Sequence, residues 1–216
     1  MLNGKNIYKT YGQLPVLKGV DIRIEKGEVV CISGPSGSGK STLLHILSTL
    51  DRPDSGEVFM NGTRLDTLGG KALAEFRNKH IGFVFQFHHL LPEFSALENV
   101  SIPGWLAGRK KNDVKEKALA LLQELGLGDR ANHKPNQLAG GEQQRVAVAR
   151  ALVNDPAIVF ADEPSGNLDT ANARDLHQLF FDLRKRSGQT FLIVTHNEEL
   201  SKLSDRLLTM KDGKIS

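Results

Sequence analysis

The string GPSGSGKS at residues 34–41 constrains the fold of this chain more than any other feature. It matches the pattern G-x-x-x-x-G-K-[S/T], and it lies between the apolar run EVVCIS and the helix-forming run TLLHILSTL. A glycine-rich loop between a strand and a helix turns backbone N–H groups toward phosphate oxygens. The sequence therefore predicts an α/β domain that binds a nucleotide.

The residues of this loop have different expected roles. Lys40 is expected to reach the β- and γ-phosphates of the nucleotide, and the Ser41 hydroxyl is expected to ligate Mg²⁺. The first turn of the following helix adds N–H groups that have no partner within the helix. We expect the nucleotide to be lined by Gly34, Pro35, Ser36, Gly37, Ser38, Gly39, Lys40, Ser41 and Thr42.

Polar side chains follow three apolar runs that have the pattern of buried strands. The runs are HIGFVF before Gln86, IVFA before Asp162 and Glu163, and FLIVT before His196. Ligands of α/β folds bind at the carboxyl ends of the strands. We therefore expect Asp162 to hold Mg²⁺ and Glu163 to polarise the attacking water as general base. His196 is expected to contact the γ-phosphate, and Gln86 to reach Mg²⁺ or the water. Acids that only cap a helix and a purely structural histidine are the alternatives.

Composition and charge exclude several classes of protein. With 216 residues, 39% of them hydrophobic, the chain can bury one domain-sized core. The net charge of +3 is spread along the sequence, and the longest basic cluster, residues 109–111, is typical of a solvated turn, so we expect no nucleic-acid partner. Cys31 is the single cysteine, which fits a reducing cytosol. No apolar stretch approaches the roughly 20 residues of a membrane span, so a membrane role requires a partner.

The order of the apolar runs predicts how the chain is organised. Short apolar stretches with turn signals predict strands in the first 33 residues, and Asn61–Gly62 predicts the turn of a hairpin. Val114, Ala118 and Leu122 repeat at helical spacing. Apolar strands that alternate with helices, one of them over about 171–187, predict a mostly parallel sheet. We expect one domain, with a catalytic core at 1–86 and 154–216 and an inserted helical subdomain at about 87–153.

A second glycine pair, in the string LAGGEQQR at residues 138–145, also precedes a run of helix formers. A helix N-terminus attracts anions because its first N–H groups are unpaired and its macrodipole is positive there. Ala139 stands before the glycines, where a hydroxyl would help to hold an anion. A single nucleotide bound by the first loop does not explain this second anion-binding turn.

These strings, in this order, resemble the nucleotide-binding subunits of ATP-binding-cassette (ABC) transporters over essentially the full length of the chain. The resemblance implies an ABC-type P-loop fold with an N-terminal antiparallel part, and a homodimer packed head to tail around two ATP molecules. Each ATP is then held by the phosphate loop of one subunit and the signature turn of the other, which is formed by Leu138, Ala139, Gly140, Gly141 and Glu142. Loss of the γ-phosphate opens the pair.

The resemblance assigns two further roles and reveals two departures. It implies that Tyr11 stacks on adenine and that Asp169, at the end of the string SGNLD, belongs to the nucleotide site. Serine and glutamine are most common in the family where this chain has Ala139 and Glu142. Without the hydroxyl at 139 the contact with the opposite γ-phosphate is weaker, while the glycine amides and the helix dipole remain. We therefore expect reduced activity, not its loss.

The string FVFQFHHLLPEFSALENV at residues 83–100 indicates a membrane partner. In the family, this part of the helical region docks the permease subunit. Docking is accordingly expected at Phe87, His88, His89, Leu90, Leu91 and Phe94. Packing of these side chains into the core of the helical subdomain is the alternative.

The same string, together with FADEPSGNLD and LGLGDR, most resembles the lipoprotein-releasing ATPases of Gram-negative bacteria. This resemblance implies a peripheral subunit on the cytoplasmic face of the inner membrane. Macrolide-efflux and cell-division ATPases share GNLD and are the nearest alternatives.

Two other classes of protein are alternatives to a transport ATPase. An ABC-type ATPase that acts on DNA or ribosomes usually has additional domains. A P-loop kinase does not need the second anion-binding turn.

Overall fold

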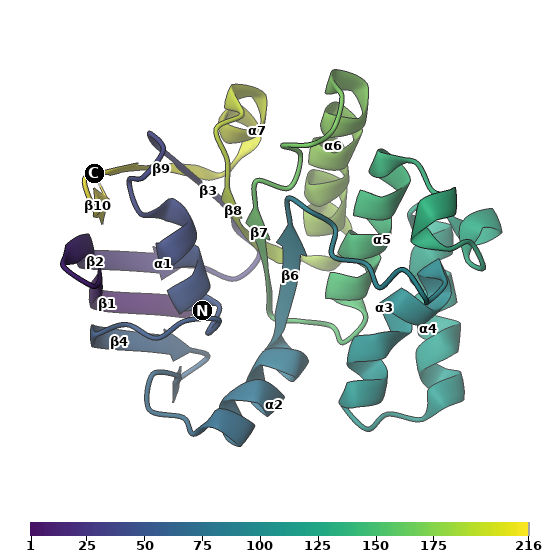
Figure 1. The fold of residues 1–216 in the computed structure, drawn as a ribbon, viewed down its shortest axis with the longest axis horizontal. Helices are drawn as coiled ribbons and strands as arrows, with labels where there is room; N and C mark the ends of the chain where they lie inside the picture. The colour runs from purple at the N-terminus through teal and green to yellow at the C-terminus, as the bar shows by residue number, and fades with distance from the viewer. Residues whose placement is uncertain (216) are drawn as a thin grey trace. The chain divides into compact units, whose positions relative to one another are not determined.

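The computed structural model describes residues 1–215, which divide into two compact units. The first unit comprises Met1–Arg77 and the chain from Leu183 onward, and the second comprises Asn78–Asp182. The helices α2 (Gly70–His80) and α6 (Thr170–Ser187) contain the points at which the chain passes from one unit to the other (Figure 1).

The first unit contains an antiparallel sheet of long strands. β1 (Leu2–Tyr11) lies between β2 (Leu14–Ile24) and β4 (Ser55–Met60), and β5 (Thr63–Arg64) pairs with β4. Burial along β1 and β2 largely alternates, because successive side chains of a strand point to opposite faces of the sheet. Asn61 and Gly62 connect β4 to β5 with φ angles of 50° and 82°, so the predicted hairpin is confirmed.

The first unit also contains parallel strands. β3 (Val29–Ser33) lies between β8 (Thr190–Val194) and β9 (Arg206–Lys211), and β10 (Lys214–Ile215) runs antiparallel to β9. Nearly every residue of β3 and β8 is buried, which accounts for their continuous apolar runs. Burial raises the pKa of the Cys31 thiol to about 11, so this side chain stays neutral and unreactive in the folded protein at neutral pH.

Two helices of the first unit directly follow these strands. α1 (Lys40–Leu47) follows β3 and buries Leu43, Leu44 and Leu47. α7 (Glu198–Leu203) follows β8, and the Asn197 side chain caps it by accepting a hydrogen bond from the Leu200 N–H. Each helix therefore begins at the carboxyl end of a parallel strand.

The second unit contains two parallel strands and most of the helices. β6 (Ile81–Phe85) pairs with β7 (Ile158–Asp162). Between them in the sequence lie α3 (Ala96–Leu106), α4 (Lys111–Glu124), α5 (Gly140–Leu152) and the short 3-10 helices η1 (Gly128–Arg130) and η2 (Pro135–Gln137). The apolar face predicted for α4 is confirmed, because Val114, Ala118 and Leu122 are fully buried.

The α/β fold class predicted from the sequence is confirmed, whereas α2 and the β9–β10 hairpin were not predicted. α2 buries only Leu73, and β9 buries only Met210, so neither segment has a strong apolar pattern. Among residues 1–215, no helix combines the length and the apolar character needed to cross a bilayer.

Candidate nucleotide-binding and catalytic site

The phosphate loop connects β3 to α1 in the first unit, as the sequence predicted. Gly34 and Gly39 have φ angles of 143° and 103°, which residues with a side chain rarely adopt. A Cβ atom at Gly34 would clash with the Met210 carbonyl oxygen, and a Cβ atom at Gly39 would lie 2.9 Å from Leu17 Cδ2. The packing of the loop against its own chain therefore requires both glycines.

The loop presents positive charge and polar groups at the start of α1. The Lys40 ammonium group donates hydrogen bonds to the carbonyl oxygens of Gly34 and Pro35, both at 2.9 Å. The Ser38 hydroxyl is buried, and within the described residues it has no hydrogen-bond partner. Because a buried hydroxyl is costly without a partner, this group suits a site that a polar ligand completes.

His196 lies close to the beginning of the phosphate loop because β3 and β8 are parallel and in register. Ile32 is opposite Val194, and the Thr195 N–H donates to the Ile32 carbonyl at 3.1 Å. Beyond this pair, β3 continues into Ser33 and Gly34. The chain after β8 continues through Thr195 into the exposed His196. The first unit thus brings the predicted histidine and the phosphate loop to the same edge of the sheet.

Tyr11, at the end of β1, also lies near the phosphate loop. Its side chain is half exposed, and its hydroxyl donates to Asp51 Oδ2 at 2.6 Å. This hydrogen bond is the main reason that the pKa of Tyr11 is raised, and the Thr42 hydroxyl acts on the phenol in the opposite direction. Thr42 belongs to the first turn of α1, so the predicted adenine contact and the predicted phosphate contact are neighbours.

In the second unit, three predicted residues meet at the carboxyl ends of β6 and β7. Phe85 is opposite Asp162, so Gln86 and Glu163 follow at the same level of the sheet. Glu163 has a positive φ of 45°, a conformation that costs free energy in a residue with a side chain and often occurs at functional sites. The Gln86 side-chain amide donates to Asn167 Oδ1 at 3.1 Å, which connects the residue after β6 to the string SGNLD.

The signature turn begins α5. Leu138 is buried, and Ala139 is the N-cap residue, with extended backbone angles and no side-chain cap. The Glu142 carboxylate accepts a hydrogen bond from the Ala139 N–H at 2.9 Å and lies 3.4 Å from Arg130 Nε. Only half of a capping box therefore forms, because alanine has no oxygen to accept the reciprocal bond.

The two glycines of the signature turn have different surroundings. A Cβ atom at Gly141 would clash with Asn172 Oδ1, whereas a Cβ atom at Gly140 would have no neighbour nearer than Leu168 Cδ2 at 3.9 Å. Asn172 is held by Asp169, whose carboxylate accepts from the Asn172 N–H at 2.9 Å and from Nδ2 at 2.7 Å. These bonds lower the pKa of Asp169. Asp169 thus fixes the asparagine that packs against the signature turn.

The segment predicted to dock a permease is not packed as a core. Phe87 is 64% exposed, Leu91 and Phe94 are exposed, His89 is exposed, and His88 and Leu90 are half-buried. The backbone of this segment is attached to α5, because the Arg150 guanidinium donates to the carbonyl oxygens of His88 and His89 at 2.8 and 2.7 Å. The aromatic side chains are therefore presented to solvent on a fixed backbone.

The sequence did not predict Gln144, a residue that organises the site. Gln144 is fully buried and donates to the carbonyl oxygens of Phe85 and Pro164 at 3.0 and 2.7 Å, and it also contacts His88 Nδ1. It lies on the buried face of α5 with Val146, Ala147 and Val148 as neighbours in the chain. A polar residue among buried positions of a helix was the signal that could have identified it.

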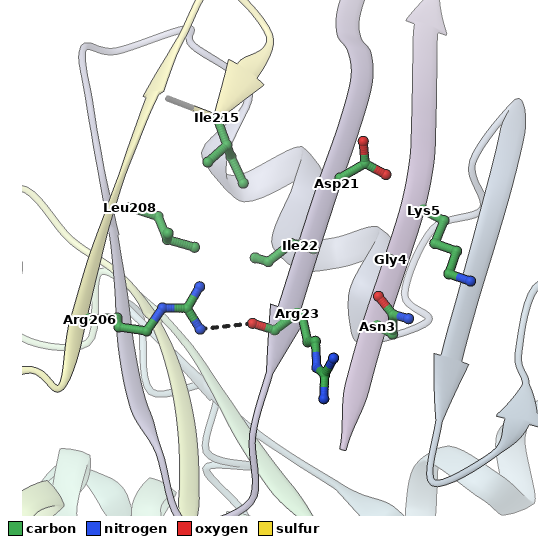
Figure 2. A pocket seen from close by; sticks show the side chains of 9 residues that line it. All are labelled: Asn3, Gly4, Lys5, Asp21, Ile22, Arg23, Arg206, Leu208 and Ile215. Carbon is green, nitrogen blue, oxygen red and sulfur yellow. Dashed lines mark hydrogen bonds between the residues drawn. The ribbon is translucent and has the colours of Figure 1, made fainter.

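A separate hollow of about 540 Å³ in the first unit contains none of the predicted site residues (Figure 2). It is lined by Asn3, Gly4, Lys5, Asp21, Ile22, Arg23, Arg206, Leu208 and Ile215. The Arg206 guanidinium donates to the Arg23 carbonyl and to a Glu28 carboxylate oxygen, at 3.0 Å in both cases. Arg206, one of the three cationic residues that line the hollow, is therefore bound to other groups of the first unit.

The fold and the geometry of the loop define a P-loop nucleotide-binding domain. Residues 17–166 match the family model for ABC transporters, and the chain belongs to that family. It is 60% identical to the lipoprotein-releasing system ATP-binding protein LolD of Bacteroides thetaiotaomicron, over all of this chain and 99% of that protein. It is also 60% identical to the protein of the same name from Cytophaga hutchinsonii, over all of this chain and 98% of that protein.

Solved structures support the same family. The dimeric ABC transporter cassette MJ0796 superimposes with a TM-score of 0.92 at 42% identity, over all of this chain and 97% of that one. A post-hydrolysis state of the same cassette, bound to ADP and Pi, gives a TM-score of 0.88 at 39% identity, over the same shares of the two chains.

Proposed function

We propose that this chain is the ATP-hydrolysing subunit of an ABC transporter that releases lipoproteins from the inner membrane, and that it works as a head-to-tail homodimer. The observation that carries the proposal is the presence in one chain of two glycine-containing turns that each begin a helix, only one of which is a P-loop. The lipoprotein cargo is supported by relatives named as lipoprotein-releasing ATP-binding proteins, 57–60% identical over the whole chain.

The phosphate loop fits the triphosphate of ATP. Lys40 binds the β- and γ-phosphates, and the loop and first helical turn, residues 34–42, surround them with N–H groups and hydroxyls. The buried Ser38 hydroxyl and the close packing at Gly34 support a preformed cradle. Tyr11 supplies an aromatic surface for the adenine.

The oxygen donors among the predicted residues suit Mg²⁺. Ser41 has a hydroxyl, Gln86 a side-chain carbonyl and Asp162 a carboxylate, and Mg²⁺ prefers such oxygen ligands together with phosphates and water. When bound, the ion supplies positive charge that offsets the charge on the phosphate oxygens. We assign these three residues to the ion.

Two side chains act on the reacting groups. Glu163 accepts the proton of the attacking water as general base, with Gln86 orienting that water. His196 donates a hydrogen bond to the γ-phosphate as charge develops on it. The strained backbone of Glu163 supports this assignment, because strain is retained where function requires a particular side-chain direction.

The signature turn serves the nucleotide of the partner subunit. Leu138–Glu142 present the N-terminus of α5 to the γ-phosphate of that ATP, and Asp169 holds the turn in place through Asn172. The symmetry of such a dimer makes its two sites equivalent. The absence of any close steric constraint from its own chain at Gly140, where a Cβ atom would lie 3.9 Å from Leu168 Cδ2, supports a contact from outside the chain.

The helical subdomain, residues 87–153, connects the site to a permease subunit at the cytoplasmic face of the inner membrane. Docking uses Phe87, His88, His89, Leu90, Leu91 and Phe94. Three apolar side chains of this segment are exposed, which supports a partner surface, since contiguous exposed apolar groups mark interaction sites. We expect no nucleic-acid partner.

The substitution Glu163→Gln tests the proposed function. It keeps the shape of the side chain and removes the base, so the rate of hydrolysis should fall about 10²- to 10⁴-fold. ATP should still bind, and a stable dimer should accumulate in size-exclusion chromatography with light scattering. The exposed Glu116→Gln on α4 is the matched control and should leave both properties unchanged. An ATP-saturated Glu163→Gln protein that stays monomeric would contradict the dimer.

The cargo requires a separate test. Depletion of this protein in its own cells should leave lipoproteins in the inner membrane, and a permease should co-purify with it from solubilised membranes. Normal lipoprotein sorting after depletion, together with loss of macrolide resistance or of cell division, would replace the proposed cargo by one of those systems.

A further inference from the structure

A buried lysine and a carboxylate surround the aromatic side chain of Tyr11 in the first unit. The Lys9 ammonium group donates to Asp51 Oδ1 at 3.1 Å and to the Arg52 carbonyl at 2.7 Å, and it lies 3.8 Å from an Asp54 oxygen. Tyr11 donates to the other carboxylate oxygen of Asp51 at 2.6 Å. One carboxylate therefore binds both neighbours, each through its own oxygen.

The ring of Tyr11 is restrained from one side and open on another. The Lys9 nitrogen lies 5.1 Å from the ring centroid, a cation–π distance, while Lys9 itself is only 9% exposed. Tyr11 nevertheless remains 48% exposed. A buried ammonium group is costly unless it is paired, and here its partners hold it in place. The ring therefore has a fixed orientation with surface left for a planar ligand.

Asp51 also joins this ring to the helix that begins in the phosphate loop. Its N–H donates to the His45 carbonyl at 3.1 Å, at the end of α1. Thr42, in the first turn of the same helix, also acts on the Tyr11 phenol through a side-chain hydrogen bond. The position of the ring is thus tied to both ends of α1.

We propose that Asp51 and Lys9 are positioning residues that hold the Tyr11 ring at a fixed distance from the phosphate loop, as a platform for the adenine of ATP. This inference rests on the proposed ATPase function and deepens it. A ring that is already ordered loses little side-chain freedom when a base stacks on it, so binding is tighter than with a mobile ring. The platform contributes to recognition of the base and not of the phosphates.

The test compares the dissociation constants of ATP and of inorganic tripolyphosphate, which has no base. Asp51→Ala and Tyr11→Phe should each weaken ATP binding about three- to tenfold, the effect of releasing one side chain. Both should leave tripolyphosphate binding unchanged. The double variant should be no weaker than Asp51→Ala alone, because that change already removes the hydrogen bond that Tyr11→Phe removes.

Control variants separate positioning from damage to the fold. Tyr8→Phe removes a phenol from the same strand and should leave ATP binding unchanged, as should Asp21→Asn on β2. Tyr11→Ala should weaken ATP binding about tenfold or more, since it removes the stacking surface itself. Adding Asp51→Ala to that variant should have no further effect.

Distinct results would overturn the inference and the proposed function. Equal weakening of ATP and tripolyphosphate by Asp51→Ala would show that Asp51 supports the phosphate loop and would overturn the inference alone. The inference alone would also be overturned if Asp51→Ala bound ATP normally while Tyr11→Ala bound it weakly. If the unaltered protein bound neither ligand, the proposed function would fail and the inference with it.

Discussion

The two glycine-rich turns of this chain are built differently, although each begins a helix and each was predicted to bind an anion. The phosphate loop is closed by its own chain, since Gly34 packs against the Met210 backbone and Lys40 bonds to loop carbonyls. The signature turn is closed on one side only. Gly141 packs against Asn172, while a Cβ atom at Gly140 would make only an ordinary van der Waals contact with Leu168 Cδ2.

This difference shows which glycines the fold itself requires. Replacement of Gly34 or Gly141 creates a clash inside the chain, so their presence is explained without any ligand. The chain gives no steric reason for glycine at position 140. A reason outside the chain, such as close approach of a phosphate, is what the proposed dimer provides. Alanine substitutions at these glycines separate requirements inside the chain from requirements outside it.

The largest effect is expected from Gly34→Ala. The new methyl group would clash with the Met210 carbonyl, and the φ of 143° would be strained, so the free energy of unfolding should fall by about 3 kcal/mol or more. ATP binding should be lost as well. Gly37→Ala is the control, because the position has a positive φ but open space, and it should cost only about 1 kcal/mol. Urea unfolding measures stability and ATP titration measures binding; equal losses of stability at 34 and 37 would contradict the packing argument.

An intermediate effect is expected from the pair Gly141→Ala and Gly140→Ala. The first should lower the free energy of unfolding by about 1–3 kcal/mol through the clash with Asn172, and Asn172→Ala should partly restore it. The second should change stability by less than about 0.5 kcal/mol. It should nevertheless weaken ATP-driven dimerisation of the Glu163→Gln protein, measured by analytical ultracentrifugation. Unchanged dimerisation would mean that position 140 contacts nothing across the interface.

The sequence predicted those features of the fold and the site that depend on residues close together in the chain. The phosphate loop lies between a strand and a helix in consecutive residues, and polar residues at the ends of buried strands follow from alternation of strands and helices. The structure places Gln86 beside Asn167 and His196 beside the loop for that reason.

Contacts between side chains far apart in the chain were not predictable in this way. Asp51 lies 40 residues from Tyr11, Gln144 lies 59 residues from Phe85, and Arg150 lies 61 residues from His89. Each of these contacts depends on how elements pack after they form, and a single sequence contains no record of that packing. Arginine and aspartate are mostly surface residues, so residue type alone indicates no buried contact for Asp51 or Arg150.

A smaller effect than that of Gly141→Ala is expected from Ala139→Ser, which tests the side of the signature turn that its own chain does not close. Ala139 occupies the N-cap of α5 with the extended backbone that a capping residue adopts, but it supplies no acceptor. A serine hydroxyl would accept from the Glu142 N–H and complete the capping box that Glu142 already half forms. Stability should rise by about 0.5–1 kcal/mol.

The proposed dimer offers the same hydroxyl a second partner, the γ-phosphate bound by the other subunit. Helix capping and this contact can be measured separately. If it reaches the partner's γ-phosphate, ATP-driven dimerisation of Ala139→Ser combined with Glu163→Gln should tighten by up to about tenfold, since a hydrogen bond to a charged group is worth about 1.5–3 kcal/mol before competition from the cap. Ala139→Asp is the informative counterpart. It caps the helix at least as well as serine, but its charge repels a phosphate, so it should stabilise the monomer and weaken the dimer. A dimer strengthened equally by both residues would show that capping alone is responsible, and that the amides and dipole of α5 suffice to bind the phosphate.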